Sequence, residues 1–201
     1  RAIANILIQK GYEVSGSDVK ESDVIERFRQ MGATVHIGHN ADYVQGVDAV
    51  VRSTAIREDN PEIVAAKEQG ITILHRSDIV KAVLDVTNGI AVAGAHGKTS
   101  TTSMIGQILV EGQMEPTVII GGEVDYLKGS SCLGKGEYSV VEADESDGSF
   151  LKLRPKTIVI TNIEDDHMDH YKTMENLLNA FCQFVETLPV DGKAVVCGDN
   201  D

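Results

Sequence analysis

The stretch Ile90-Ala-Val-Ala93-Gly94-Ala-His-Gly97-Lys98-Thr99-Ser100 joins an uninterrupted apolar run to a glycine-rich turn. Apolar runs without alternation are typical of parallel strands that are buried on both faces. A helical pattern follows from Lys98 to about Glu111. The order of strand, glycine-rich turn and helix predicts an α/β fold built on a parallel sheet.

Helical and strand patterns alternate along the rest of the chain. Other helices are predicted at 1–10, 24–31, 61–69, 77–85 and 173–188. Other strands are predicted at 12–16, 34–37, 49–53, 72–74, 117–120, 138–142, 157–163 and 193–196, with a glycine-rich turn region at 121–136. This alternation predicts parallel strands in a doubly wound sheet.

The dipeptide Asn88-Gly89 separates two halves of this pattern. We therefore predict a domain over 1–86 and a second domain over 87–201. The chain opens within a helical pattern that has no N-cap before it, and it closes after a strand that no helix follows. We expect both domains to be incomplete.

Composition limits the classes of function. The chain has 201 residues, of which 42% are hydrophobic and 24% charged, as in globular proteins. Its net charge of −13 argues against duplex nucleic acid or an anionic membrane as the main partner. No apolar stretch is long enough to span a bilayer, and Cys132, Cys182 and Cys197 show no metal-ligand spacing. These features predict a soluble, cytoplasmic protein with reduced cysteines.

The turn at Gly94–Ser100 has the chemistry of a triphosphate-binding loop. A glycine-rich turn offers backbone N–H groups, and the following helix start adds partial positive charge. Lys98 can reach the β and γ oxygens, and the Thr99 hydroxyl can bind Mg²⁺. Only two residues separate Gly94 from Gly97, which departs from the common GxxxxGK[ST] spacing. A structural turn with an incidental lysine is the alternative.

A second polar cluster, Glu142-Ala-Asp144-Glu145-Ser-Asp147, follows an apolar strand. Ligands of open α/β sheets bind at the carboxyl ends of strands, so we expect Glu142 near the phosphate loop. A carboxylate there suits Mg²⁺, which prefers oxygen ligands. The alternative is an acidic, solvated loop.

The third cluster, Thr161-Asn162-Ile-Glu164-Asp-Asp166-His167-Met-Asp-His170, also follows an apolar strand. Three strand ends should thus converge on one rim. His167 is a candidate metal ligand or proton carrier, and a surface histidine at a helix start is the alternative. Of the remaining histidines, we interpret His36, His39 and His75 as structural or solvent-facing, and His96 lies inside the phosphate loop.

The first half carries a weaker signal. Ser17-Asp18 places an acid at the end of a predicted strand, where dinucleotide-binding folds often contact a ribose hydroxyl. No glycine-rich turn precedes it in this chain, so a surface acid remains an equal alternative.

Together, three segments resemble the Mur ligase family of ATP-dependent amide-bond-forming enzymes: Ala93–Ser100, Glu142–Leu151 and Thr161–Tyr171. The resemblance covers essentially the whole chain. It implies a Rossmann-like UDP-sugar-binding domain followed by a P-loop-type ATPase domain. It also implies a pyrophosphate-binding turn before Arg1 and a third domain, neither of which the sequence contains.

The resemblance also implies roles for individual residues. ATP would be bound by Gly94, Ala95, His96, Gly97, Lys98, Thr99, Ser100 and Asn162, with Lys98 on the γ-phosphate. Thr99 and Glu142 would bind one Mg²⁺ ion, and His167 a second. Lys98, Glu142 and His167 would form the catalytic set. Substrate would contact Ser17, Asp18, Ser53, Thr54, Asp144, Glu145 and Ser146. The segment 173–188 contains no lysine, so the carbamylated lysine of some relatives is not expected.

The implied reaction uses ATP to join L-alanine to the lactyl carboxylate of UDP-N-acetylmuramate through an acyl phosphate, in peptidoglycan precursor synthesis. Alternatives are a recycling ligase that adds a tripeptide to the same UDP sugar, and a P-loop nucleotide-binding module without ligase chemistry. Ser146, Ser149 and Phe150 favour the alanine-adding reaction within the family. A folded but inactive fragment is a further possibility for this chain by itself.

Overall fold

The computed structural model describes residues 1–199 and divides into two compact units. One unit contains Ile3–Arg76 and the other begins at Ser77, while Arg1 groups with the first unit and Ala2 with the second. The predicted domain boundary between 86 and 87 stays a prediction. The last two residues of the predicted second domain, 200–201, lie outside the described residues.

The first unit contains two separate pairs of parallel strands. Strand β1 (Ser15–Asp18) pairs with β2 (Thr34–Ile37), and β3 (Ala49–Arg52) pairs with β4 (Thr72–His75). Its helices are α1 (Ala2–Gln9), α2 (Asp23–Gln30), η1 (Ala41–Val44) and α3 (Pro61–Glu68). Within the described residues no hydrogen bonds join the two pairs into the single sheet that we predicted, because each four-residue strand bonds only one neighbour.

The second unit contains a six-stranded sheet in the order β10-β9-β5-β8-β6-β7. Its parallel strands are β5 (Asn88–Ala93), β6 (Thr117–Val124), β8 (Tyr138–Glu142), β9 (Thr157–Ile160) and β10 (Lys193–Val196). β5 is central, with β9 on one side and β8 on the other. The α/β class and the parallel core are thereby confirmed.

One edge of this sheet differs from the prediction. The region 121–136 contains the end of β6, a short helix η2 (Asp125–Leu127) and the strand β7 (Gly129–Cys132). β7 runs antiparallel to β6. Its sequence, Gly-Ser-Ser-Cys, lacks the branched apolar residues of a typical strand, which is why it resembled a turn.

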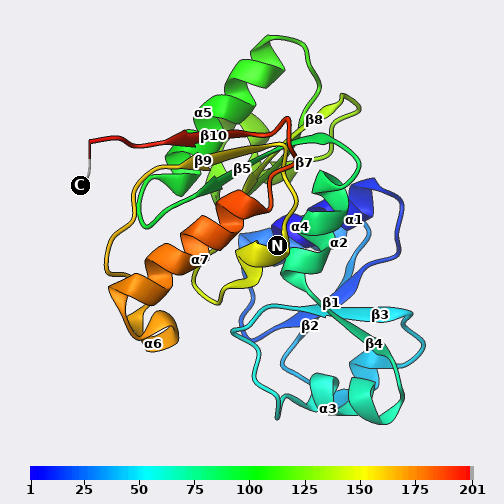
Figure 1. Cartoon of the computed structure of the whole chain (residues 1–201). Helices are drawn as coiled ribbons and strands as arrows, with labels where there is room; N and C mark the ends of the chain where they lie inside the picture. Colours follow the sequence, from blue (N-terminus) through cyan, green and yellow to red (C-terminus); the bar gives the residue numbers. More distant parts are fainter. Residues whose placement is uncertain (200–201) are drawn as a thin grey trace. The chain divides into compact units, whose positions relative to one another are not determined.

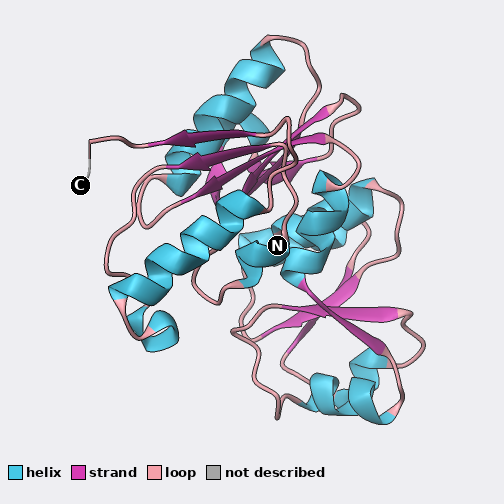
Figure 2. Ribbon diagram, in the orientation of Figure 1, coloured by secondary structure: helices cyan, strands magenta, loops and turns pink. Residues whose placement is uncertain are grey.

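Helices cover both faces of the sheet. Figures 1 and 2 show α5 (Lys98–Glu111) over one face and α7 (Met174–Glu186) over the other. The chain moves from β5 toward β6 through α5 and from β9 toward β10 through α7, in opposite directions along the sheet. Right-handed crossovers in opposite directions place their helices on opposite faces. The remaining helices of this unit are α4 (Arg76–Leu84), η3 (Ser149–Lys152) and α6 (Met168–Tyr171).

An aromatic cluster fixes α7 to the segment that follows β8. The Phe150 ring lies 4.7 Å from the Phe184 ring and 5.4 Å from the Phe181 ring, measured between centroids. All three side chains are buried. Because the loops after β8 and β9 both adjoin this cluster, its packing supports the polar segments at the strand ends.

We expect Phe184→Ala to lower the free energy of unfolding by about 3 to 5 kcal/mol, because it leaves a cavity in a fully buried cluster. Leu178→Ala is the matched control, since Leu178 lies on the same helix with 43% of its surface exposed. Its expected cost is about 0.5 kcal/mol. Urea unfolding followed by circular dichroism measures both. Equal losses would contradict this account of the core.

Candidate active site at the carboxyl ends of three neighbouring strands

The three polar segments follow the three central strands of the sheet. The phosphate loop follows β5, the carboxylate cluster follows β8, and the His/Asp cluster follows β9. β5 is parallel to both neighbours, so all three segments emerge at the same edge of the sheet. The predicted convergence on one rim is confirmed. It also lies where the connections from the sheet change direction, the usual ligand position in such folds.

The residue Asn162 braces the phosphate loop. The backbone N–H of Ala95 donates to Asn162 O at 3.1 Å, and the N–H of His96 donates to Asn162 Oδ1 at 2.9 Å. Asn162 Nδ2 donates back to His96 O at 2.9 Å. These bonds occupy two N–H groups that we expected to face phosphate. The remaining donors are those at the start of α5, where Gly97 is the N-cap and no side chain caps the helix.

Gly94 lets the loop pass close to the end of β9. Its φ of +132° is rare for other residues, and an added Cβ would lie 2.2 Å from Thr161 Oγ1 and 2.7 Å from Asn162 O. Thr161 Oγ1 also donates to His96 O at 2.6 Å. Thr161 was absent from our predicted site, and its position directly after an apolar strand was the available signal.

The ammonium group of Lys98 folds back onto its own loop. Lys98 Nζ donates to Gly94 O, to Ala95 O at 3.3 Å, and to Glu145 Oε1 at 2.7 Å. The Lys98 side chain is 19% exposed and that of Glu145 is 2% exposed. The structure thus places Glu145, a predicted substrate contact, beside the predicted phosphate-binding lysine.

Glu142 and Thr99 lie against two adjacent glycines, Gly121 and Gly122 respectively. A Cβ at Gly121 would lie 2.6 Å from Glu142 Oε2, and a Cβ at Gly122 would lie 3.5 Å from Thr99 Cγ2. Glu142 Oε1 is buried and has no hydrogen-bond partner among the described residues. A buried carboxylate oxygen without a partner is a candidate ligand position, and glycine at position 121 lets the Glu142 carboxylate pack close to β6.

His167 is held in an unusual backbone conformation. It has φ of +57° and is the N-cap of α6, and its N–H donates to Asp166 Oδ1 at 2.8 Å. His167 Nε2 lies 3.6 Å from Asp166 Oδ2 and 3.7 Å from Glu145 Oε1. The ring nitrogen therefore faces two carboxylates at once.

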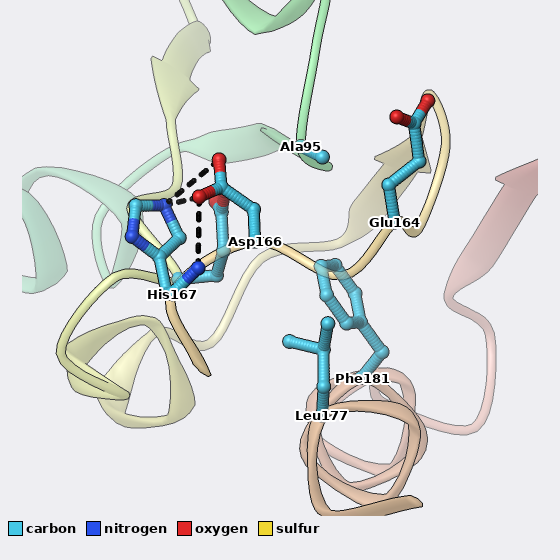
Figure 3. A pocket seen from close by; sticks show the side chains of 7 residues that line it. Ala95, Glu164, Asp166, His167, Leu177 and Phe181 are labelled. Atoms are coloured by element: carbon cyan, nitrogen blue, oxygen red, sulfur yellow. Dashed lines mark hydrogen bonds and ion pairs between the residues drawn. The ribbon is translucent and has the colours of Figure 1, made fainter. Parts of the chain in front are cut away.

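A small pocket adjoins these groups. Its lining comprises Ala95, Glu145, Glu164, Asp166, His167, Leu177 and Phe181. Figure 3 shows Leu177 and Phe181 rising from the helix on one side, with His167 and Asp166 facing each other on the other. The pocket thus has an apolar wall from α7 and a polar wall from the loops after β8 and β9.

Tyr171 anchors the carboxylate segment from α6. Its hydroxyl donates to the backbone oxygen of Glu145. Burial, followed by the nearby carboxylate of Glu145, raises the pKa of Tyr171 to about 12. The phenol therefore stays protonated and remains a donor throughout the physiological range.

This rim offers oxygen donors of the kind that Mg²⁺ prefers. Among residues 1–199, no three or more His, Cys, Asp and Glu side chains form a metal-binding group. Mg²⁺ in nucleotide sites usually takes one or two protein oxygens and completes its shell with phosphates and water. The orphaned Glu142 oxygen fits that requirement, and a ligand role for Thr99 stays a prediction. A ligand role for His167 stays a prediction.

Ser17, a predicted substrate contact of the first unit, belongs to a small polar network. Ser17 Oγ donates to Glu62 Oε1 at 2.6 Å and lies 3.0 Å from His39 Nδ1, which is 3.1 Å from the same carboxylate oxygen. Because the Ser17 proton is used on Glu62, only its lone pairs remain for a ligand. His39 and Glu62 were not predicted, since they come from distant parts of the sequence.

The structure also shows the polar partners of other predicted substrate contacts. Asp18 Oδ2 lies 3.8 Å from Arg1, and Thr54 Oγ1 lies 3.1 Å from His75 Nε2. Ser53 O accepts a bond from the N–H of Ile56, and Asp144 Oδ1 accepts one from the N–H of Ser146. Substrate binding by these residues stays a prediction.

Fold and site together define a class of protein: an α/β domain whose glycine-rich loop, carboxylates and histidine share one end of a parallel sheet. Residues 1–86 match the model for the Mur ligase family catalytic domain, and residues 92–201 match that for the Mur ligase middle domain. The chain belongs to the Mur ligase family. The family resemblance of the motifs is thereby confirmed.

Curated relatives include UDP-N-acetylmuramate--L-alanine ligases. The chain is 48% identical to that of Desulfatibacillum aliphaticivorans, over 99% of this chain and 44% of the relative. It is 50% identical to that of Desulforamulus reducens, over 98% of this chain and 43% of the relative. The chain therefore spans less than half the length of these relatives.

Solved structures show the same likeness. UDP-N-acetylmuramate-alanine ligase from Thermotoga maritima matches with a TM-score of 0.91 and 30% identity, over 99% of this chain and 46% of that one. UDP-N-acetylmuramate:L-alanyl-gamma-D-glutamyl-meso-diaminopimelate ligase from Neisseria meningitides matches with a TM-score of 0.91 and 27% identity, over 100% of this chain and 68% of that one. The fold by itself does not separate the two reactions.

We expect Gly94→Ala to destabilise the loop far more than Gly97→Ala. The Gly94 Cβ would clash with Thr161 and Asn162, whereas the nearest atoms to a Gly97 Cβ are 4.0 Å away and only its positive φ is strained. The expected cost at Gly97 is about 1 kcal/mol. Thermal unfolding measures both variants, and a larger loss at Gly97 would contradict the close approach at Gly94.

Proposed function

We propose that the protein containing this chain is an ATP-dependent ligase that joins L-alanine to the lactyl carboxylate of UDP-N-acetylmuramate. The observation that carries the proposal is the gathering of Lys98, Glu142 and His167 at the ends of β5, β8 and β9. The curated relatives named for this reaction, at 48% and 50% identity, support the choice of substrates.

In the proposed reaction, an oxygen of the lactyl carboxylate attacks the γ-phosphorus of ATP and ADP leaves. The L-alanine amine then attacks the acyl carbon of the acyl phosphate, loses a proton, and phosphate leaves. Carboxylate is a poor electrophile, so the phosphoryl group is needed to make its oxygen a leaving group. The products are UDP-N-acetylmuramoyl-L-alanine, ADP and phosphate.

The chain's own residues would supply positioning and charge. The first turn of α5 and the Lys98 ammonium would bind the phosphates, and Asn162 would hold the loop in shape. Thr99 and Glu142 would hold Mg²⁺, with His167 at a second ion. Bound there, Mg²⁺ would neutralise charge on the transferring phosphoryl group.

The first unit would hold the UDP sugar, with Ser17, Asp18, Ser53 and Thr54 as contacts. In the second unit, Asp144 and Ser146 would be further substrate contacts. A cytoplasmic location follows from this function, since nucleotide-linked precursors and ATP are found there. No helix within residues 1–199 is long and apolar enough to cross a membrane.

The recycling ligase is the second candidate, because the Neisseria meningitides structure fits as well as the Thermotoga maritima one. The test uses the full-length protein with ATP, Mg²⁺, UDP-N-acetylmuramate and either L-alanine or the tripeptide. We expect phosphate release and a product of the right mass with L-alanine. Product only with the tripeptide would establish the second candidate, and no product with either would favour a nucleotide-binding module.

We expect Glu142→Gln to raise the Mg²⁺ concentration needed for half-maximal activity and to lower kcat by about 10²-fold. The substitution keeps the shape of the side chain but removes the anionic oxygen that lacks a partner. The measurement is an Mg²⁺ titration of phosphate release in the full-length protein. Glu137→Gln, an exposed position before β8, is the control. An unchanged Mg²⁺ titration in Glu142→Gln would favour the alternative, in which Glu142 belongs to an acidic loop without a metal-binding role.

A further inference from the structure

The donor count of Lys98 limits what this lysine can bind. An ammonium group has three N–H donors, and here they point to Gly94 O, Ala95 O and Glu145 Oε1. A phosphate oxygen can be added only if one of these acceptors gives up its bond. The strongest of the three bonds is the one to the charged carboxylate, because charge-assisted bonds exceed neutral ones.

The Glu145 side chain has little freedom to move with the Lys98 ammonium group. Its side chain is 2% exposed, and its backbone oxygen is held by the Tyr171 hydroxyl and by the N–H of Gly148 at 3.1 Å. Glu145 Oε2 has no hydrogen-bond partner among the described residues. Lys98 is thus the closest positive charge that offsets the burial of this carboxylate.

A second basic group faces the same oxygen. His167 Nε2 lies 3.7 Å from Glu145 Oε1, farther than the 2.7 Å of Lys98 Nζ. The carboxylate is therefore positioned between the two groups that would act on ATP and its metal. Its charge affects both, although Glu145 need not touch nucleotide itself.

We propose that Glu145 is a positioning residue that competes with the nucleotide's terminal phosphates for Lys98, and so sets the affinity for ATP. This proposal rests on the proposed function of the same loop. It assigns Glu145 a role toward Lys98 in place of the substrate contact that the sequence predicted. Removing its charge should free the ammonium for phosphate and tighten ATP binding.

The test compares Glu145→Gln with Glu164→Gln in the full-length protein. Glu164 lies on the same rim and in the same pocket, but its carboxylate pairs with His96 at 3.5 Å. Both variants remove one negative charge. Calorimetric titration with ATP and Mg²⁺, without the UDP sugar and amino acid, gives the dissociation constant. We expect about a tenfold lower Kd for Glu145→Gln, and less than a twofold change for Glu164→Gln.

Two further measurements separate competition from other roles. AMP lacks the terminal phosphates, so its Kd should be the same in Glu145→Gln and in the unsubstituted protein. The KM for UDP-N-acetylmuramate should also stay unchanged, whereas a substrate contact would raise it. An ATP Kd that is unchanged or higher in Glu145→Gln would overturn the proposal, as would equal tightening by Glu164→Gln.

A second variant keeps the test decisive if Glu145→Gln does not fold. Glu145→Asp retains the charge but withdraws it by one methylene from Lys98, and it should lower the ATP Kd by a smaller factor. An unchanged ATP Kd in a folded Glu145→Asp would then overturn the proposal.

Failure of the ligase function is distinguishable, because ATP binding is measured without product formation. A protein that binds ATP but makes no product would contradict only the ligase assignment.

Discussion

The ion pair between Lys98 and the buried carboxylate of Glu145 is the interaction on which the geometry of the site depends. Carboxylates are strongly hydrated, so their burial is tolerated only beside a compensating charge and hydrogen bonds. Here the partner is the first residue of α5, and the contact of 2.7 Å joins the loop after β5 to the segment after β8. One charge pair thereby fixes the relative positions of two of the three polar segments. The third polar segment, after β9, is joined to the loop after β5 by the hydrogen bonds of Asn162 to Ala95 and His96.

This arrangement is possible because the sheet order places β9 and β8 on either side of β5. Parallel strands end at a common edge, so segments far apart in the sequence become neighbours without any long loop. The close approach at Gly94 then sets the distance between the phosphate loop and β9, since any side chain there would meet Thr161. The buried rings of Phe181 and Phe184 on α7 pack against Phe150 and thereby support the segment after β8.

The central strands and the phosphate loop could be predicted because their signals are local. The apolar run before Gly94, the glycines and Lys98 lie within a few residues, and strand 138–142 and helix 98–111 were located correctly. β7 was missed because Gly-Ser-Ser-Cys has turn composition, and only its pairing with β6 makes it a strand. The bond between Lys98 and Glu145 joins residues 47 positions apart, so no spacing rule reveals it. The same holds for Ser17 with Glu62, which are 45 positions apart.

Because the chain is acidic, the positive charge of Lys98 matters for the attraction of any anion to this loop. With its net charge of −13, this chain repels a polyanion such as ATP, so attraction must be local and short in range. The start of α5 supplies only the partial charge of its unpaired N–H groups, and the rim around it carries several carboxylates. Lys98 is the full positive charge within this loop, and it is already shared with Glu145. An anion can therefore bind Lys98 only by replacing one of the three hydrogen bonds that its ammonium group already makes.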